Sequence, residues 1–296
     1  MYKFKVQEAK RVRVILSTDA KCEADDQYAI VHALLTPKFD VKGIVVAQWG
    51  GQNRYPTVME GKEEVEKIFD LMGTSGVPLY AGHDLPLESD TEVVDNEGVD
   101  FIINEALKED DKPLFVLCQG SITDVGAALI KCPEIAGRFT CVWIGGGAYP
   151  NGGWEFNSTN DIIAANTVMR SSLELWQVPM SSYIQMQVSY AELQAKVMPC
   201  GKIGKYLFDQ LVILGETAGW INGESWALGD SPAIGLAMNH NCGTFYTRKA
   251  PLFDQNANYI ECDTNREIRV YDVIDKRFIL EDFFAKLKIN YPKEAK

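Results

Sequence analysis

Residues 12–35 read VRVILSTDAKCEADDQYAIVHALL, and this stretch decides the fold. Its first part, Val12–Leu16, is a short and largely β-branched run that is typical of a buried strand. The part that begins at Asp26 has the apolar spacing of a helix. Three aspartates and a glutamate lie where the two meet, although acidic residues are poor in strands and in cores. The pattern predicts a strand, an acidic loop and a helix.

The same alternation of short apolar runs and helical stretches continues along the chain. The expected strands are Val12–Leu16, Val41–Ala47, Leu114–Leu117, Phe139–Ile144 and Met180–Gln187. The expected helices are Asp26–Leu35, Gly61–Met72, Gly98–Lys108, Ile122–Leu129, Asp161–Ser171, Tyr190–Val197 and Ile203–Gly215. This order predicts an α/β fold with a doubly wound, mostly parallel sheet and helices on both faces.

The end of the chain has a different pattern. Residues 257–273 alternate polar and apolar side chains, which predicts a small antiparallel addition near the C-terminus. Residues 279–289 (ILEDFFAKLKI) have the pattern of a closing helix. No linker, repeat or low-complexity segment interrupts the chain, so we expect one domain over residues 1–296.

Composition excludes several classes of function. The net charge is −12 and no long basic run occurs, which argues against a nucleic-acid partner. No segment has the roughly 18–20 apolar residues that span a membrane, and the charged N-terminus does not resemble a signal peptide. Seven cysteines without a CxxC pair and three histidines offer little for a structural zinc site. We expect a reduced, cytoplasmic protein.

Polar and glycine-rich segments follow the expected strands. They are TDAKCEADD (18–26), QWGGQN (48–53), CQGSITD (118–124) and GGGAYPNGGWEFN (145–157), and GDSPAIGLAMNH (229–240) supplies a further acid before a helix. Ligands bind at the carboxyl ends of the strands in open α/β sheets. Glycine allows close approach of the backbone to a ligand. Together these segments predict one binding site.

The candidate acids of this site are Asp19, Asp25, Asp26 and Asp230. An aspartate at the start of a helix often caps it, which explains one of the adjacent pair Asp25 and Asp26 but leaves Asp19 unexplained. Converging carboxylates repel one another unless a cation neutralises them. A hard divalent cation with oxygen ligands does so, and the shortage of suitably placed His and Cys favours Ca²⁺ or Mg²⁺ over zinc.

The ordered motifs resemble those of the calcium-dependent nucleoside hydrolases, the inosine-uridine preferring type, and particularly a divergent branch whose longer acidic loop ends in DDQ. Beyond that loop, the resemblance rests on GVPLYAGHDLPL (76–87), QGSITDVGAALIKCPEIAGR (119–138), IGGGAY (144–149), EFN (155–157) and GDSPAIGLA (229–237). It covers nearly the whole chain. It implies a nucleoside-hydrolase-like fold and calcium-dependent hydrolysis of the N-glycosidic bond of a ribonucleoside or related riboside, giving free base and ribose.

The resemblance also implies residue roles. Asp19 matches an aspartate that binds Ca²⁺ and takes a proton from the attacking water. Asp26, Asp230 and the backbone carbonyl of Gln119 match the other metal ligands. The residues expected to bind substrate are Asp25, Glu155, Asn157 and, by its place in the loop, Asn151 for the ribose, Gly51 and Asn53 after the second strand, and Trp49 and Trp154 for the base.

Three departures from the family pattern matter. The loop between Asp19 and Asp26 is two residues longer than usual, so the extra residues bulge outward or Glu23 reaches the metal. Gly51 stands where the family typically has an asparagine. Gly229 precedes Asp230, where many pyrimidine-accepting members have a histidine that protonates the leaving base.

The missing histidine leaves alternatives open. His240 lies ten residues beyond Asp230, about three helical turns, and is a poor substitute. A purine preference with stacking on tryptophan is one outcome. A substrate that is not an ordinary nucleoside is the other. A metal-dependent riboside-binding protein with weakened catalysis is an alternative from another class of function. A magnesium-dependent phosphatase ranks last, because the acidic loops have no paired arginines.

Two cysteines flank the predicted site. Cys22 and Cys118 have no histidine near them in sequence, so we do not expect a nucleophilic cysteine. By analogy with the family we expect a homodimer or homotetramer.

Overall fold

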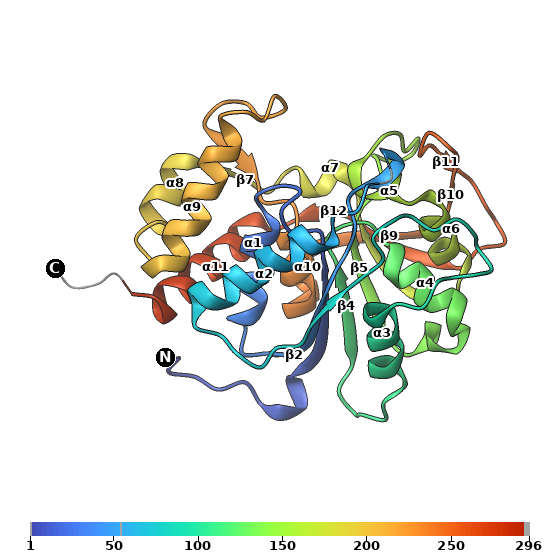
Figure 1. Ribbon diagram of the computed structural model, residues 1–296, viewed down its shortest axis with the longest axis horizontal. Helices are drawn as coiled ribbons and strands as arrows, with labels where there is room; N and C mark the ends of the chain where they lie inside the picture. Colours follow the sequence, from blue (N-terminus) through green and yellow to red (C-terminus); the bar gives the residue numbers. More distant parts are fainter. Residues whose placement is uncertain (1, 54, 293–296) are drawn as a thin grey trace.

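The computed structural model describes residues 2–53 and 55–292 (Figure 1). Its main sheet has the strand order β3-β2-β1-β4-β5-β6-β12-β9. The bounds are β1 (Val12–Thr18), β2 (Phe39–Val46), β3 (Leu79–Ala81), β4 (Leu114–Cys118), β5 (Thr140–Ile144), β6 (Glu174–Val178), β9 (Gly243–Lys249) and β12 (Glu267–Ile274). Neighbouring strands are parallel except β12 and β9, which are antiparallel. The predicted sheet and its antiparallel addition are confirmed.

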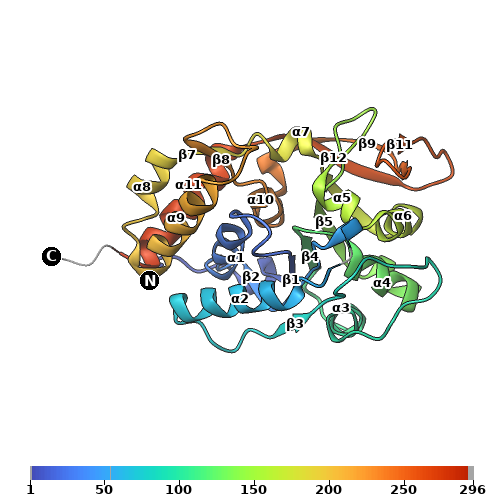
Figure 2. The same cartoon turned by 45° about the horizontal axis from the view of Figure 1, so that its top comes forward.

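Helices cover both faces of the sheet (Figures 1 and 2). One face packs on α1 (Asp26–Leu34), α2 (Val58–Met72), α8 (Tyr190–Lys196), α9 (Gly201–Gly215), α10 (Ser231–Met238) and α11 (Lys276–Asn290). The other packs on α3 (Glu97–Leu107), α4 (Thr123–Lys131) and α6 (Ile162–Arg170). Side chains alternate along a strand, so Val14 and Leu16 of β1 enter the first core and Ile15 enters the second.

The first four predicted strands and all the predicted helices are confirmed within a few residues. The predicted strand Met180–Gln187 is wrong. The strand is β6, and Met180–Tyr183 form the short helix α7 instead. Pro179 separates them, because proline has no N–H for a ladder and often begins a helix. The sequence pattern did not reveal β6 because the strand contains polar residues. One of them, Gln177, is nevertheless buried, and its side chain donates a hydrogen bond to the carbonyl of Gly145.

Short elements complete the fold. β7 (Gln187–Ser189) pairs with β8 (Ser225–Ala227), and β10 (Leu252–Phe253) pairs with β11 (Tyr259–Ile260). The helix α5 (Phe156–Asn160) follows the loop after β5. No helix in the described part of the chain is long and apolar enough to cross a membrane.

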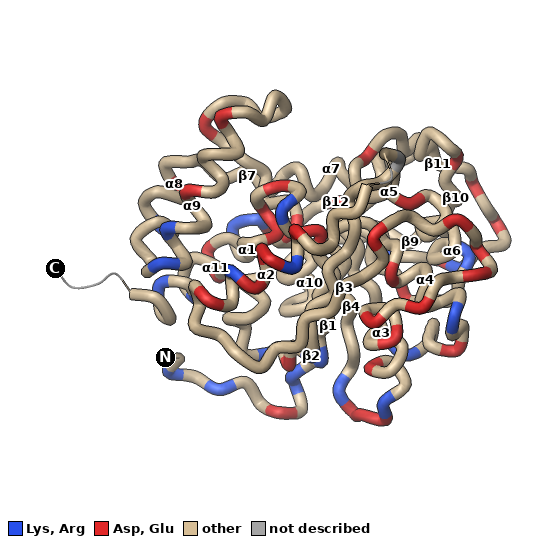
Figure 3. Tube along the Cα trace, viewed as in Figure 1, with Lys and Arg blue, Asp and Glu red and all other residues tan. Residues whose placement is uncertain are grey.

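The direction in which strands are added to the sheet reverses between β1 and β4. From β1 the chain builds β2 and β3 toward one edge, while β4, β5 and β6 extend toward the other. The loops after β1 and β4 therefore diverge at their carboxyl ends, where ligands bind in such sheets. The tube view shows acidic positions in the connection between β1 and α1, near the middle of the molecule (Figure 3).

Candidate active site

The loop between β1 and α1 folds back on itself at the end of the strand. The N–H of Cys22 donates to the carbonyl of Asp19 at 3.1 Å, and Lys21 has a positive φ of 92°. Asp25 stands at the N-cap of α1, but its side chain makes no capping bond there. It accepts a hydrogen bond from the N–H of Asp230 at 3.2 Å instead. Helix capping therefore does not explain Asp25, which joins this loop to the start of α10.

Asp19 is buried and incompletely bonded. Only 2% of the surface of Asp19 is exposed to solvent. Its side-chain oxygen Oδ2 has no hydrogen-bond partner within the described residues. Gly120, in the loop after β4, lies so close that a Cβ there would be 2.7 Å from Asp19 Oδ1. Glycine at this position lets the two loops meet around the carboxylate.

The predicted acids converge. Oxygen atoms of Asp25, Asp26 and Asp230 lie within 4.8 Å of one another, and so do ligand atoms of Asp19, Cys22 and Asp26. Asp26 belongs to both groups, and its Oδ1 also accepts a 2.5 Å hydrogen bond from the Thr18 hydroxyl. The structure thus brings together three predicted metal ligands and the acid predicted to bind the sugar.

Burial raises the pKa values of these carboxyls. It raises the pKa of Asp19 to about 8, and the charge of Asp25 adds to the effect. Burial and nearby acids also raise the pKa of Glu23 to about 8, and burial raises that of Asp25 to about 6. Burial and the neighbouring charges place the pKa values of Asp26 and Asp230 well above their usual range. Carboxyls whose pKa lies above neutrality, such as those of Asp19 and Glu23, are mostly protonated near pH 7 unless a cation displaces the protons.

A divalent cation fits this donor set. The clustered ligand atoms are mostly carboxylate oxygens, one of which has no partner, and the carbonyl of Gln119 lies in the adjacent loop. Hard cations such as Ca²⁺ and Mg²⁺ prefer such oxygens. Glu23, which the longer loop introduces, is half-buried and lies outside both clustered groups in the described structure.

Glu155 holds the other side of the site together. Its buried carboxylate accepts from the N–H groups of Gly146 at 2.7 Å, Asn157 at 3.1 Å and Ser158 at 2.9 Å. These bonds make it the N-cap of α5. Asn157 in turn donates to the carbonyl oxygens of Gln119 at 3.0 Å and Ile144 at 2.9 Å. Glu155 therefore ties the loop after β5 to the start of α5, and Asn157 links α5 to the loop after β4.

The sequence did not indicate Tyr183. Its hydroxyl donates to Glu155 Oε1 at 2.9 Å, and burial raises its pKa, with Glu155 adding to the shift. A Cβ added to Gly229 would lie 3.0 Å from the Tyr183 ring and 3.4 Å from Asp25 Oδ2. The ring therefore lies beside Gly229, in the direction a side chain there would take. Because Tyr183 falls in the wrongly predicted strand, no pattern linked it to the site.

The side chain of Gln119 was also missed. Only its carbonyl was predicted as a ligand, yet both polar atoms of the buried amide lack hydrogen-bond partners in the described structure. A buried unpaired polar group costs about 1–3 kcal/mol. The amide is therefore a candidate to bind a ligand group beside the acids.

The remaining predicted substrate residues are more dispersed. Asn53 and Asn151 are exposed, and Trp154 is 69% exposed beside Glu155. The half-buried ring of Trp49 lies against Gly61 of α2, since a Cβ on Gly61 would be 3.2 Å from it. Their substrate roles stay predictions.

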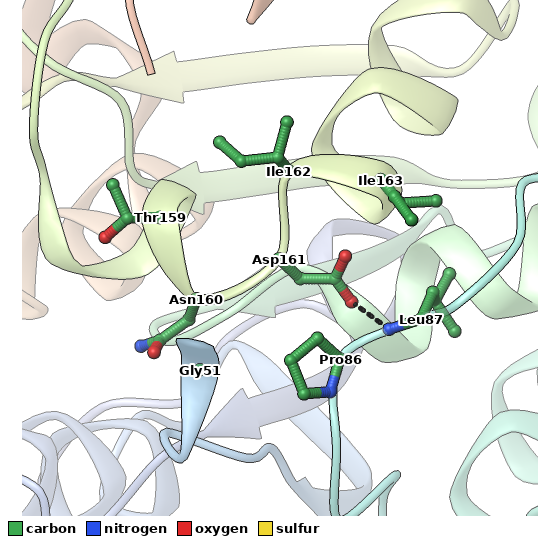
Figure 4. Close-up of a pocket in the computed structure, with 8 residues that line it drawn as sticks. All are labelled: Gly51, Pro86, Leu87, Thr159, Asn160, Asp161, Ile162 and Ile163. Atoms are coloured by element: carbon green, nitrogen blue, oxygen red, sulfur yellow. Dashed lines mark hydrogen bonds between the residues drawn. The ribbon is translucent and has the colours of Figure 1, made fainter. Parts of the chain in front are cut away.

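Gly51 borders a separate cavity of about 250 Å³ (Figure 4). Its lining is Gly51, Pro86, Leu87, Thr159, Asn160, Asp161, Ile162 and Ile163, which includes none of the clustered acids. Gly51 has a φ of +46°, and a Cβ there would lie 2.1 Å from Asn160 Oδ1. Close approach to α5 thus explains this glycine, and its predicted part in substrate binding stays a prediction.

The histidines lie elsewhere. His32 is buried beside Asp282, with 2.8 Å between Nε2 and Oδ2, and His83 Nδ1 is 3.0 Å from Asp124 Oδ1. His240 is exposed beyond the end of α10. Cys118 is buried, and its thiol lies near the carbonyl oxygens of Gly120 and Ser121. None of these contacts joins a histidine or Cys118 to the clustered acids.

The structure defines a mostly parallel α/β protein with clustered acids at the carboxyl ends of its strands, and comparison with known proteins identifies the family. The sequence profile described as inosine-uridine preferring nucleoside hydrolase matches residues 14–274. The chain therefore belongs to this family, which confirms the resemblance inferred from its motifs.

Individual relatives agree with this assignment. The chain is similar to the pyrimidine-specific ribonucleoside hydrolase RihA of Citrobacter koseri, with 29% identity over 50% of this chain and 54% of the relative. It spans about half the length of that relative. The RihA of Salmonella arizonae is 24% identical over 81% of each chain. A purine-preferring ribonucleoside hydrolase from Gardnerella vaginalis has the same fold, with a TM-score of 0.78 and 23% identity over 94% of this chain and 99% of that one.

Proposed function

We propose that this protein hydrolyses the N-glycosidic bond of a ribonucleoside or a related riboside, giving free base and ribose. One observation carries the proposal: buried acids from two distant loops converge at the carboxyl ends of the strands in a nucleoside-hydrolase-family fold, and Asp19 keeps an unpartnered oxygen there. Burial of several carboxylates with few donors is costly unless a ligand uses them.

Asp19, Asp26, Asp230 and the carbonyl of Gln119 would hold the cation, which we propose is Ca²⁺. When bound, it would make a water more acidic and hold vicinal ribose hydroxyls. Its oxygen-rich surroundings support calcium over a softer metal in the catalytic role.

The protein's own residues would carry the reaction. Asp19 takes the proton of the attacking water, which its unpartnered Oδ2 is free to accept. Asp25 binds ribose hydroxyls, and Glu155 and Asn157 form the opposite wall. The negative charge of the carboxylates stabilises the oxocarbenium-like sugar as the C–N bond breaks.

We propose a purine as the preferred base. Gly229 supplies no acid beside Asp230, and the pKa of Tyr183 is raised, so its phenol holds its proton too tightly to protonate a leaving base readily. A purine ring can instead be protonated by solvent while an indole stacks on it, and the exposed Trp154 is the candidate. The names of relatives differ here, since RihA is called pyrimidine-specific and the Gardnerella enzyme purine-preferring.

Hydrolysis of inosine, uridine and nitrophenyl riboside tests both proposals. We expect Ca²⁺-dependent release of base, faster from inosine than from uridine, and loss of turnover in Asp19→Ala. Full activity of Asp19→Ala would overturn the mechanism, and faster uridine cleavage would overturn the purine preference. If ribose stabilises the protein only with Ca²⁺ while no substrate is cleaved, the protein is a metal-dependent riboside-binding protein instead.

The cellular and quaternary proposals rest on analogy with the family. We propose a cytoplasmic protein that forms a homodimer or homotetramer. Light scattering coupled to gel filtration tests the oligomer, and a monomeric mass would overturn it.

A further inference from the structure

The longer acidic loop places a thiol among the clustered acids. Cys22 Sγ lies 3.9 Å from Asp26 Oδ2. Together with one oxygen each of Asp19 and Asp26, it forms a group whose ligand atoms lie within 4.8 Å of one another. The hydrolase function proposed above gives this thiol no role.

The turn in the loop directs Cys22 toward the acids. Its N–H is tied back to the carbonyl of Asp19, and Lys21 before it has a positive φ of 92°. The half-exposed Lys21 side chain forms an ion pair with the buried Glu64 of α2 at 3.5 Å. This contact anchors the residue next to the thiol, so the position of Cys22 is built into the loop.

A second observation indicates that a ligand belongs here. Asp19 is almost fully buried, and its Oδ2 has no hydrogen-bond partner within the described residues. Asp19 belongs to the same group of possible metal ligands as the Cys22 thiol. A buried carboxylate oxygen of this kind normally has a donor or a cation.

The atom types select a kind of cation. Ca²⁺ takes oxygen ligands, whereas a sulfur ligand favours Zn²⁺ and related soft ions. Zinc bonds of about 2.0–2.2 Å to oxygen and about 2.3 Å to sulfur imply a sulfur–oxygen separation of roughly 3.6 Å in a tetrahedral site. The 3.9 Å between Cys22 and Asp26 needs little adjustment to reach it.

We propose that Asp19, Cys22 and Asp26 bind a thiophilic divalent cation of the Zn²⁺ and Cd²⁺ type, in competition with the Ca²⁺ of the proposed function. On binding, the thiol proton leaves to solvent and the sulfur becomes a thiolate ligand. Such an ion occupies Asp19, the proposed base, and so inhibits hydrolysis. The inference rests on the proposed cation site at Asp19 and Asp26, but it does not require turnover.

Cadmium alone is the probe, and the protein carries Cys262→Ser as its background. Cys22 and Cys262 are the partly exposed cysteines, and the other five are buried. Cys262→Ser therefore leaves Cys22 as the one cysteine that is partly exposed among the described residues, and it is itself expected to leave activity unchanged. We expect one equivalent of Cd²⁺ to slow iodoacetamide labelling of Cys22 by roughly tenfold or more, while equimolar Ca²⁺ does not. Peptide mass spectrometry identifies the labelled residue.

Matched Cys22→Ser and Cys22→Ala variants provide a spectroscopic readout. Cd²⁺ should produce an ultraviolet cadmium–thiolate absorption band in the Cys262→Ser protein, and the band should be absent from both double variants. Unchanged labelling of Cys22, or the same band and affinity without Cys22, would overturn the inference. Neither readout uses a nucleoside. The binding result and the hydrolase proposal can therefore fail separately, and labelling requires no variant of Cys22 to fold.

Discussion

Two sets of buried carboxylates in this protein have opposite surroundings. Asp161 accepts from the N–H groups of Leu87 and Ala164 and from the Thr123 hydroxyl, all at 2.8–2.9 Å. Glu155 is equally well supplied with donors. In the cluster after β1, by contrast, Asp19 keeps an unpartnered oxygen and its neighbours are mainly other acids.

This difference in hydrogen-bond donors distinguishes carboxylates that stabilise the fold from carboxylates that are available to a ligand. A carboxylate whose lone pairs all meet N–H or O–H donors stabilises the loops and helix ends that supply them. A group of buried carboxylates that face one another lowers the stability of the folded state. Such a group is therefore expected where a bound ligand offsets the loss of stability. Asp161 should therefore respond to mutation through stability, the second set through activity, and Glu155, which also has a proposed substrate role, through both.

Asp19→Asn tests the second set most severely. Removal of the proposed base should lower kcat by about 10²–10⁴ for the best substrate. The metal-free protein should be at least as stable as the wild type, because a buried unpaired carboxyl is replaced by a neutral amide. Steady-state kinetics and thermal unfolding measure the two effects. Unimpaired hydrolysis would remove Asp19 from the mechanism.

The stability of the metal-free protein should fall as the pH rises from 5 to 8. The folded-state pKa values of Asp19 and Glu23 are raised to about 8, so the folded protein holds protons that the unfolded chain has already released. Stability is then greatest at low pH and is lost through this window. We expect a decrease in Tm of several degrees, at about 2 °C per kcal/mol.

Calcium should reverse most of that loss, because it replaces the protons. Differential scanning calorimetry at pH 5 and pH 8, with Ca²⁺ and with a chelator, provides the comparison. A Tm that is equal at both pH values without metal would contradict the unpaired state of the cluster.

Asp161→Ala, a substitution in the first set, should lower stability and leave activity largely unchanged, the opposite of the effect expected for Asp19→Asn. The N–H of Leu87 and the cap of α6 lose their acceptor, so the free energy of unfolding should fall by about 1–3 kcal/mol while kcat of the folded protein stays close to normal. Urea unfolding measures the change, and the exposed Asp111→Ala serves as the control. A large fall in kcat without a loss of stability would place Asp161 with the functional acids.

Tyr183→Phe should give the smallest effect. It removes one hydrogen bond to the Glu155 carboxyl group, which is worth roughly 0.5–3 kcal/mol. Because the ring beside Gly229 remains, we expect KM to change by a few fold with little change in the preference for inosine over uridine. A switch toward uridine would show that the phenol, rather than the ring, controls the base.

Much of the fold and of the candidate site could be predicted from the sequence, because local sequence patterns determine the strands, the helices and the positions of the acids. The apolar runs and the acids at their ends predicted β1, α1 and the convergence of Asp19, Asp26 and Asp230. What could not be predicted depends on distant contacts. The polar residues of β6 are buried because Gln177 finds partners across the fold, and no spacing rule reveals such a bond.

The same limit applies to the site. Tyr183 reaches Glu155 only because Pro179 starts a short helix, and the buried amide of Gln119 becomes visible only when its surroundings are known. The sequence left helix capping open for one of Asp25 and Asp26. The absence of a capping bond from Asp25 and its bond to the N–H of Asp230 distinguished the two interpretations. The sequence identifies the acids, whereas their partners come from tertiary structure.

The bond between Asp25 and the N–H of Asp230 spans 205 positions of the chain. Closing so long a loop comes late in folding, because its entropy must be overcome before the contact can form. A cation whose ligands come from loops this far apart in sequence cannot nucleate folding, and its stabilisation should appear chiefly in the unfolding rate. Calcium would then slow the unfolding of the native state without speeding up its folding.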